Sequence, residues 1–175
     1  MRRRNQMPMV RRPLVRLLVL LLVLFFAGCD GGKPGKPLTL GDQAPAFTAR
    51  DLAGQTISLA AWQGKPVILR FWSTDCKYCR ADTPIFNSYF DKYQERGLKV
   101  VYISRNPDEK TVRDFVADLD IRFPVVIDTR GELAALYHVR VDPQTIIIDP
   151  EQKIVAAILG GVSEAELQRL LGAYL

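Results

Sequence analysis

Two cysteines, Cys76 and Cys79, are the residues of this chain whose type and spacing best suit chemistry. A Cys-x-x-Cys pair serves thiol–disulfide exchange or supplies two ligands of a zinc site. A structural zinc site normally needs four ligands, and the one histidine, His138, lies far along the chain. A purely structural disulfide here would close too small a ring to restrict the unfolded chain much. The pair therefore favours redox exchange with no metal and no separate cofactor, because a dithiol itself carries two electrons.

The position of the pair along the chain gives a physical reason for that chemistry. The apolar run Val67–Trp72 predicts a buried strand that ends shortly before the pair. The pair begins a helix, where backbone N–H groups and the helix dipole stabilise a thiolate at the first cysteine. The second cysteine lies one helical turn further and can attack a mixed disulfide formed by the first. We expect Cys76 to be the attacking nucleophile and Cys79 to be the buried resolving thiol.

Strands and helices alternate along the rest of the chain and predict an α/β sandwich whose mixed sheet is covered on both faces. Apolar runs between turn residues predict strands, and apolar residues three or four apart predict helices. The expected strands are 47–50 and 56–59 (a hairpin), 67–72, 100–103, 125–127, and 145–149 and 154–159 (a second hairpin). The expected helices are one through 85–93 that ends before Gly97, 108–119, 132–137, and one opened by a capping box at Ser163.

Charge and composition exclude several classes of protein. The 175-residue chain has a formal net charge of +5, which by itself suggests nucleic acid or an anionic membrane surface as a partner. Six of the 24 Lys and Arg residues precede residue 17, however, and none of the 19 acidic residues does. The rest of the chain is therefore close to neutral and offers no support for nucleic-acid binding. The 48% hydrophobic content excludes a disordered chain, and three cysteines are too few for a disulfide scaffold.

The N-terminal segment has the pattern of an export signal. Its basic residues precede the apolar run Leu17–Ala27, which is shorter than the roughly 20 residues that a membrane-spanning helix needs. The run leads into Phe-Ala-Gly-Cys, ending at Cys29, which resembles a bacterial lipobox whose cysteine is acylated after cleavage. We predict a signal peptide over 1–28, a lipid on Cys29, and a flexible tether over 29–39.

The domain proper is expected over 40–175, exported and lipid-anchored on the periplasmic side of the bacterial inner membrane. Asp30 follows the cysteine and resembles a signal for retention in the inner membrane. An uncleaved N-terminal anchor is the alternative interpretation, and it too places the domain outside the cytoplasmic membrane.

The active-site stretch resembles that of the extracytoplasmic thioredoxin-like proteins of the TlpA/ResA/CcmG family. The similarity extends over about residues 40–172. The segments that carry it are 41–47, 64–67, 71–84, 137–139 and 142–149. The resemblance implies a thioredoxin-like α/β/α sandwich with a central mixed sheet and an N-terminal β-hairpin extension.

The resemblance also implies roles for residues near the dithiol. Pro143 would follow a cis peptide bond beside the cysteines, although a trans proline that opens a strand is the alternative. Trp72 would support the site from below, or would simply pack in the core. Asp82 stands where the family often has a glutamate. It would relay the proton of Cys79 and raise its pKa, or it is a solvated first-turn acid.

Three positions depart from the family pattern. Asp75 replaces an aromatic residue, Asp142 stands before Pro143 where small or β-branched residues are usual, and Arg70 occupies the buried strand. A buried arginine needs a partner, so we expect Arg70 to pair with Asp75, Asp82 or Asp142.

Taken together, these features predict a membrane-tethered reductase of disulfides in substrate proteins. By resemblance, apocytochrome c is one client, and a membrane thiol reductase of the DsbD or CcdA kind supplies the electrons. A disulfide-donating oxidase and a non-enzymatic assembly lipoprotein are alternatives. A peroxidase of the peroxiredoxin type is a further one, but Leu69 stands where its site would require a proline.

Overall fold

The computed structural model describes residues 38–175. The predicted signal peptide, Cys29 and most of the tether lie outside the described residues, so those predictions stand as made. The strands are β1 (Thr48–Arg50), β2 (Thr56–Ser58), β3 (Val67–Trp72), β4 (Lys99–Ser104), β5 (Val125–Ile127), β6 (Gln144–Ile148) and β7 (Ile154–Leu159). The helices are α2 (Lys77–Tyr93), α3 (Glu109–Asp118), α4 (Glu132–Leu136) and α5 (Glu164–Leu171), with 3₁₀ turns η1 (Ala60–Trp62) and η2 (Gln94–Arg96).

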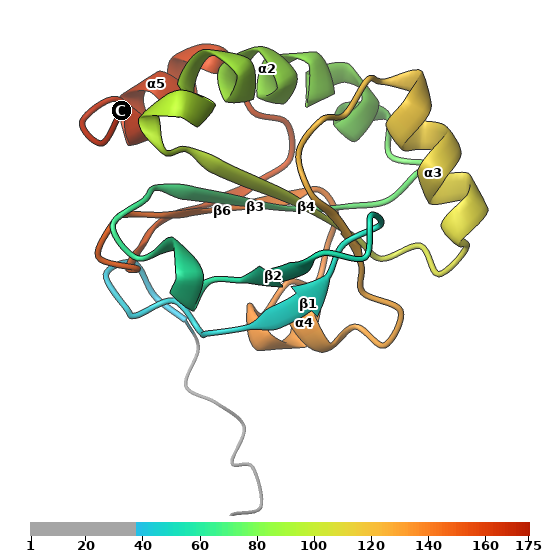
Figure 1. Ribbon diagram of the computed structural model, residues 1–175, viewed down its shortest axis with the longest axis horizontal. Coiled ribbons are helices and arrows are strands. Elements are labelled where there is room, and N and C mark those ends of the chain that lie inside the picture. The colour runs from blue at the N-terminus through green and yellow to red at the C-terminus, as the bar shows by residue number, and fades with distance from the viewer. Residues whose placement is uncertain (1–37) are drawn as a thin grey trace, which may run out of the picture. The chain divides into compact units, whose positions relative to one another are not determined.

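Five strands form one mixed sheet in the order β5-β4-β3-β6-β7. The central strand β3 pairs in parallel with β4 and antiparallel with β6. Helices α2, α3 and α5 cover one face of this sheet, and the β1-β2 hairpin with α4 lies on the other (Figure 1). This arrangement confirms the predicted thioredoxin-like sandwich with an N-terminal hairpin, which forms its own two-stranded sheet.

Strand β3 is buried on both of its faces, as its nearly unbroken apolar sequence requires. Alternate side chains point to opposite sides of a strand. Val67, Leu69 and Phe71 join the core cluster on the hairpin side, whereas Ile68 and Trp72 join the cluster under α2, α3 and α5. The one charged residue of the strand therefore points into the layer that holds the active-site helix.

The ends of helix α2 follow from local signals. Cys76 is its N-cap in an extended conformation, and its sulfur accepts a hydrogen bond from the N–H of Cys79. The α-helix ends at Tyr93, after which one 3₁₀ turn leads to Gly97 at φ 100°, a conformation that favours glycine. Pro84 lies inside α2.

Most predicted elements are confirmed with ends shifted by a residue or two, because helices and strands fray at their termini. Ser163 caps α5 through a hydrogen bond from the N–H of Glu166, as its sequence pattern predicted. The turn η1 was not predicted, since three residues leave no periodic pattern to detect. Within residues 38–175, no helix has the length and apolar character needed to cross a membrane.

Candidate active site

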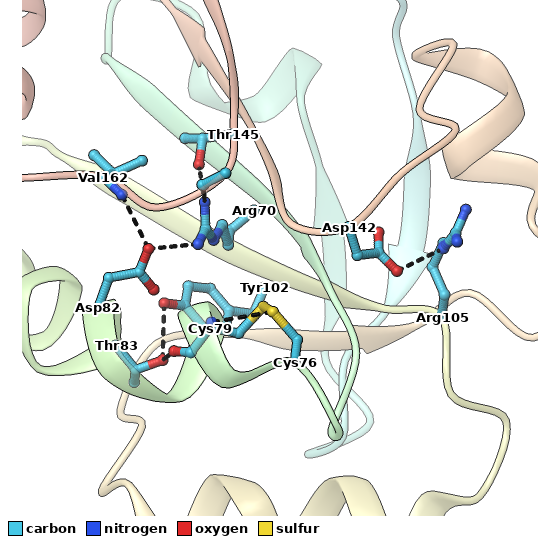
Figure 2. Close-up of a disulfide and its surroundings, with 11 residues drawn as sticks. Arg70, Cys76, Cys79, Asp82, Thr83, Tyr102, Arg105, Asp142, Thr145 and Val162 are labelled. Carbon is cyan, nitrogen blue, oxygen red and sulfur yellow. Dashed lines mark hydrogen bonds and ion pairs between the residues drawn. A yellow bond between two sulfur atoms is a disulfide. The ribbon is translucent and has the colours of Figure 1, made fainter.

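Cys76 and Cys79 form a disulfide at the N-terminal end of α2, with their Cα atoms 5.3 Å apart (Figure 2). Cys76 is partly exposed, whereas Cys79 is completely buried. The N–H of Cys79 points at the sulfur of Cys76 from 3.1 Å, which is the geometry that stabilises a thiolate at a helix N-terminus. The exposure of the two cysteines thus agrees with an outer nucleophile and an inner resolving thiol.

Trp72 ends strand β3 and lies in the same core cluster as Cys79. Its ring centroid is 4.3 Å from that of Phe115 and 5.9 Å from that of Tyr102. Trp72 is therefore packed in the core, in the cluster that holds Cys79, whereas its role as a support of the dithiol stays a prediction.

Arg70 is fully buried and its guanidinium binds three separate parts of the chain. One terminal nitrogen, Nη1, donates to Thr145 Oγ1 at 2.6 Å and to the carbonyl of Gly160 at 3.0 Å. The other, Nη2, donates to Asp82 Oδ2 at 2.5 Å. The guanidinium also lies 5.2 Å from the centre of the Phe86 ring, within cation–π range. The expected acidic partner of Arg70 is thus Asp82, and not Asp75 or Asp142.

Asp82 lies on α2, three residues after Cys79, and its side chain is 6% exposed. Residues three apart share a helix face, so the carboxylate and the buried thiol lie on the same side of α2. Its Oδ2 accepts from Arg70 and from the N–H of Val162, 3.1 Å away. Asp82 is therefore a buried, paired acid, and the alternative of a solvated first-turn acid is wrong.

For both Asp82 and Arg70, burial and ion pairing shift the pKa in opposite directions. Desolvation raises the pKa of Asp82 above its ordinary value, while the nearby charge of Arg70 and the Val162 N–H oppose that rise. Desolvation likewise lowers the pKa of Arg70, although a guanidinium stays protonated in proteins. Tyr102, whose hydroxyl lies 3.2 Å from that of Thr83, has its pKa raised mainly by burial.

The loop before β6 faces the segment that precedes Cys76, because Asp142 lines one open hollow with Ser73, Thr74 and Asp75. The Asp142–Pro143 peptide bond is cis, as the resemblance implied. Asp142 pairs with Arg105, with Oδ2 and Nε 2.8 Å apart, and its other oxygen is buried with no hydrogen bond within the described residues. Asp75 is exposed and lines an open hollow next to Cys76 together with Thr74, Asn106 and the Arg105–Asp142 pair. Larger hollows exist, such as one beside β7 and α5, but none of its lining residues belongs to the dithiol site.

The contacts of several site residues were not predicted from the sequence. Thr145 and Gly160 hold Arg70, Val162 holds Asp82, and Arg105 holds Asp142. Each contact joins residues far apart in the chain, and only the pairing of β3 with β6 would have placed Thr145 opposite Arg70. Among residues 38–175, no cluster of three or more His, Cys, Asp or Glu side chains is arranged to hold a metal ion.

A redox dithiol at a helix N-terminus, just after the central strand of this mixed sheet and beside a cis-proline loop, defines a thioredoxin-like thiol-disulfide oxidoreductase. Residues 40–157 match the AhpC/TSA family. The chain is 34% identical over 134 residues to the thiol-disulfide oxidoreductase ResA of Bacillus thuringiensis subsp. konkukian, covering 77% of this chain and 78% of the relative. It is 31% identical over 150 residues to ResA of Bacillus subtilis, covering 85% and 84%.

Solved structures agree with these sequence relatives. A thiol:disulfide interchange protein described as DsbE, from Chlorobium tepidum, superposes with a TM-score of 0.72 at 28% identity, covering 78% of this chain and 98% of that one. A secreted Mycobacterium tuberculosis disulfide oxidoreductase homologous to Escherichia coli DsbE gives 0.66 at 25% identity, covering 73% and 95%. The chain belongs to the AhpC/TSA family and, within it, to the ResA/CcmG thiol-disulfide oxidoreductases. It is an enzyme of disulfide exchange, which disfavours the peroxidase and non-enzymatic alternatives.

The buried ion pair gives a stability prediction. Arg70→Met leaves Asp82 buried without its cation, so unfolding of the oxidised protein in urea should require about 3–5 kcal/mol less free energy. The double variant Arg70→Met/Asp82→Asn buries neither charge and should recover much of that loss. Arg122→Met, which breaks the exposed pair with Asp91, is the matched control and should cost less than about 1 kcal/mol. A loss in Arg70→Met no larger than in this control would contradict a structural role for the buried pair.

Proposed function

We propose that this protein is a membrane-tethered reductase of disulfides in substrate proteins outside the cytoplasm. The observation that carries the proposal is the dithiol with an accessible Cys76, a buried Cys79 and a buried carboxylate, Asp82, on the same helix face as Cys79. A carboxylate in that position can take up and return the proton of Cys79. Its negative charge disfavours the Cys79 thiolate, which makes the reduced pair less stable and the dithiol a stronger reductant.

The exchange proceeds in two steps that balance. The thiolate of Cys76 attacks a sulfur of the client disulfide, the client S–S bond breaks, and the other client sulfur leaves as a thiolate that takes up a proton. Cys79 then gives its proton to Asp82 and attacks Cys76, which closes the Cys76–Cys79 disulfide and releases the second client thiolate. The client gains two electrons and the protein loses two, so no separate cofactor is required.

The oxidised pair must be re-reduced before the next cycle. Compartments outside the cytoplasm are oxidising, so a reductase there needs a dedicated source of electrons. We propose a membrane thiol reductase of the DsbD or CcdA kind as that source. Apocytochrome c is the client class that the family resemblance favours, because its haem-attachment cysteines must be reduced before ligation.

The proposed location rests on the N-terminal sequence. The basic segment, the apolar run Leu17–Ala27 and the lipobox-like end at Cys29 support export and a lipid anchor at the periplasmic face of the inner membrane. One solved relative is described as secreted, which is compatible with this compartment.

A specific observation also supports a second candidate, a disulfide-donating oxidase. Arg70 places a positive charge in the layer under the dithiol, and a nearby cation stabilises a thiolate and hence the reduced form. A stabilised reduced form makes a dithiol a stronger oxidant. The direction of exchange therefore depends on how far Asp82 neutralises that charge.

Trapping tests the roles of the two cysteines. Cys79→Ala leaves Cys76 able to attack but removes the resolving thiol, so mixed disulfides with client proteins should accumulate in cells. The matched variant Cys76→Ala should trap far fewer, since the buried Cys79 cannot reach a client. The adducts are counted on non-reducing gels and the bound proteins identified by mass spectrometry; equal trapping by both variants would contradict the assignment.

The reduction potential tests the direction. Equilibration of the Cys76–Cys79 pair with glutathione or dithiothreitol should give a midpoint below about −200 mV, in the range of glutaredoxins and thioredoxin. A midpoint near about −120 mV, as in DsbA, would overturn the reductase proposal and favour the oxidase.

Labelling with radioactive palmitate tests the anchor. Cys29→Ser in the full chain removes the acylated side chain, so label from radioactive palmitate should be lost and the signal sequence should stay uncleaved. Cys76→Ser is the matched cysteine control and should retain the label. Incorporation of palmitate by the Cys29 variant would refute the lipoprotein assignment.

A further inference from the structure

The buried charge of Arg70 is a strong electrostatic feature of the site that disulfide exchange does not itself require. A buried guanidinium is expensive to desolvate and is destabilising unless it is paired and hydrogen-bonded. Arg70 nevertheless stands in the central strand β3, at full burial, in the layer between the sheet and helix α2.

The guanidinium cannot turn away from Asp82. Its Nη1 is fixed by the hydroxyl of Thr145 on β6 and by the carbonyl of Gly160 after β7. That pair of bonds leaves Nη2 directed at Oδ2 of Asp82 (Figure 2). Thr145 and Gly160 are neutral acceptors, so they set the orientation of Arg70 without cancelling its charge. The charge is left to act on the carboxylate.

The two oxygens of Asp82 are used differently. Oδ2 accepts from both Arg70 and the N–H of Val162. Oδ1 is buried and has no hydrogen-bond partner among the described residues. An ionised carboxylate with one oxygen occupied and the other unoccupied can accept one proton without giving up its existing bonds.

We propose that Arg70 is a positioning residue for the proton transfer: it keeps Asp82 ionised and turned so that Oδ1 is free to accept the proton of Cys79. This inference rests on the proposed exchange chemistry and adds to it the group that sets the basicity of the acceptor. In the resolving step the S–H bond of Cys79 breaks and its proton goes to Asp82. The sulfur of Cys79 then bonds to Cys76, and the client sulfur leaves with the electron pair.

The other groups around the carboxylate do not replace Arg70. From β4, Tyr102 interacts with both members of the pair, but burial raises its pKa and keeps it neutral. Asp142, on the loop before β6, adds only a weaker interaction with Arg70. Val162 contributes a neutral N–H, and Thr83 bonds to the Cys79 carbonyl and to Tyr102. Without Arg70, only backbone N–H groups, chiefly that of Val162, would oppose the effect of desolvation on Asp82, so its pKa would rise further.

The test follows the resolving step directly. Reduced full-length protein is mixed with Ellman's reagent, and the thionitrobenzoate released as Cys79 attacks the Cys76 mixed disulfide is followed at successive pH values. This phase is intramolecular, so its rate is independent of reagent concentration, which separates it from reaction at Cys29. The acidic limb of its pH profile should move to higher pH by at least about one unit in Arg70→Met, which corresponds to a tenfold lower rate on that limb.

Four further variants make the result decisive. Arg70→Lys keeps the charge and should place the limb between wild type and Arg70→Met. Asp82→Asn and the double variant Arg70→Met/Asp82→Asn should both lose the limb, because the acceptor itself is gone. Arg122→Met removes an arginine from an exposed ion pair and should leave the profile unchanged.

Two outcomes overturn the proposal. One is a limb in Arg70→Met at the same pH as in wild type, and the other is a limb that persists in the double variant. If Arg70→Met fails to fold by circular dichroism, the double variant and Arg70→Lys still decide the matter. The measurement does not depend on which way electrons flow to clients, so a failed reductase proposal would leave it intact and interpretable.

Discussion

The pairing of Arg70 with Asp82 is the interaction on which the arrangement of the active site depends. It joins the central strand β3 to helix α2, and its outer hydrogen bonds reach Thr145 on β6 and the segment 160–162 before α5. Four segments of the chain are therefore fixed around one buried pair. Because neither charge can be left alone in the core, any displacement of these segments is opposed by a large desolvation penalty.

This constraint holds the two cysteines in unlike environments. Cys76 caps α2 at the protein surface, where the N–H of Cys79 faces its sulfur. Cys79 lies one turn inward, in the cluster that also holds Trp72, and on the helix face of Asp82. Helix α2 therefore stabilises the thiolate of the partly exposed Cys76 at its N-terminus and places the carboxylate of Asp82 on the face of the buried Cys79. That difference makes the first cysteine suited to attack a client and the second suited to release it.

The cis-proline loop is tied to the same framework from the other side. The N–H of Gly160 donates to the carbonyl of Pro143, while the carbonyl of Gly160 accepts from Arg70. Asp142 is held by Arg105, whose own N–H donates to the carbonyl of Trp72. Two of the three departures from the family pattern, Arg70 and Asp142, therefore lie in separate ion pairs, with Asp82 and Arg105 respectively.

The sequence by itself determined the fold class, the order of its elements and the reactive pair. Apolar periodicity and turn residues are local signals, and the position of Cys76 at a helix start follows from the strand before it. It also predicted that Arg70 must have an acidic partner, because a charge in a buried strand cannot stay alone. Only the tertiary structure decided that this partner is Asp82 and that Thr145, Gly160 and Val162 complete the arrangement. These contacts depend on strand order and on which face of β3 meets α2, and no local pattern in the chain encodes either.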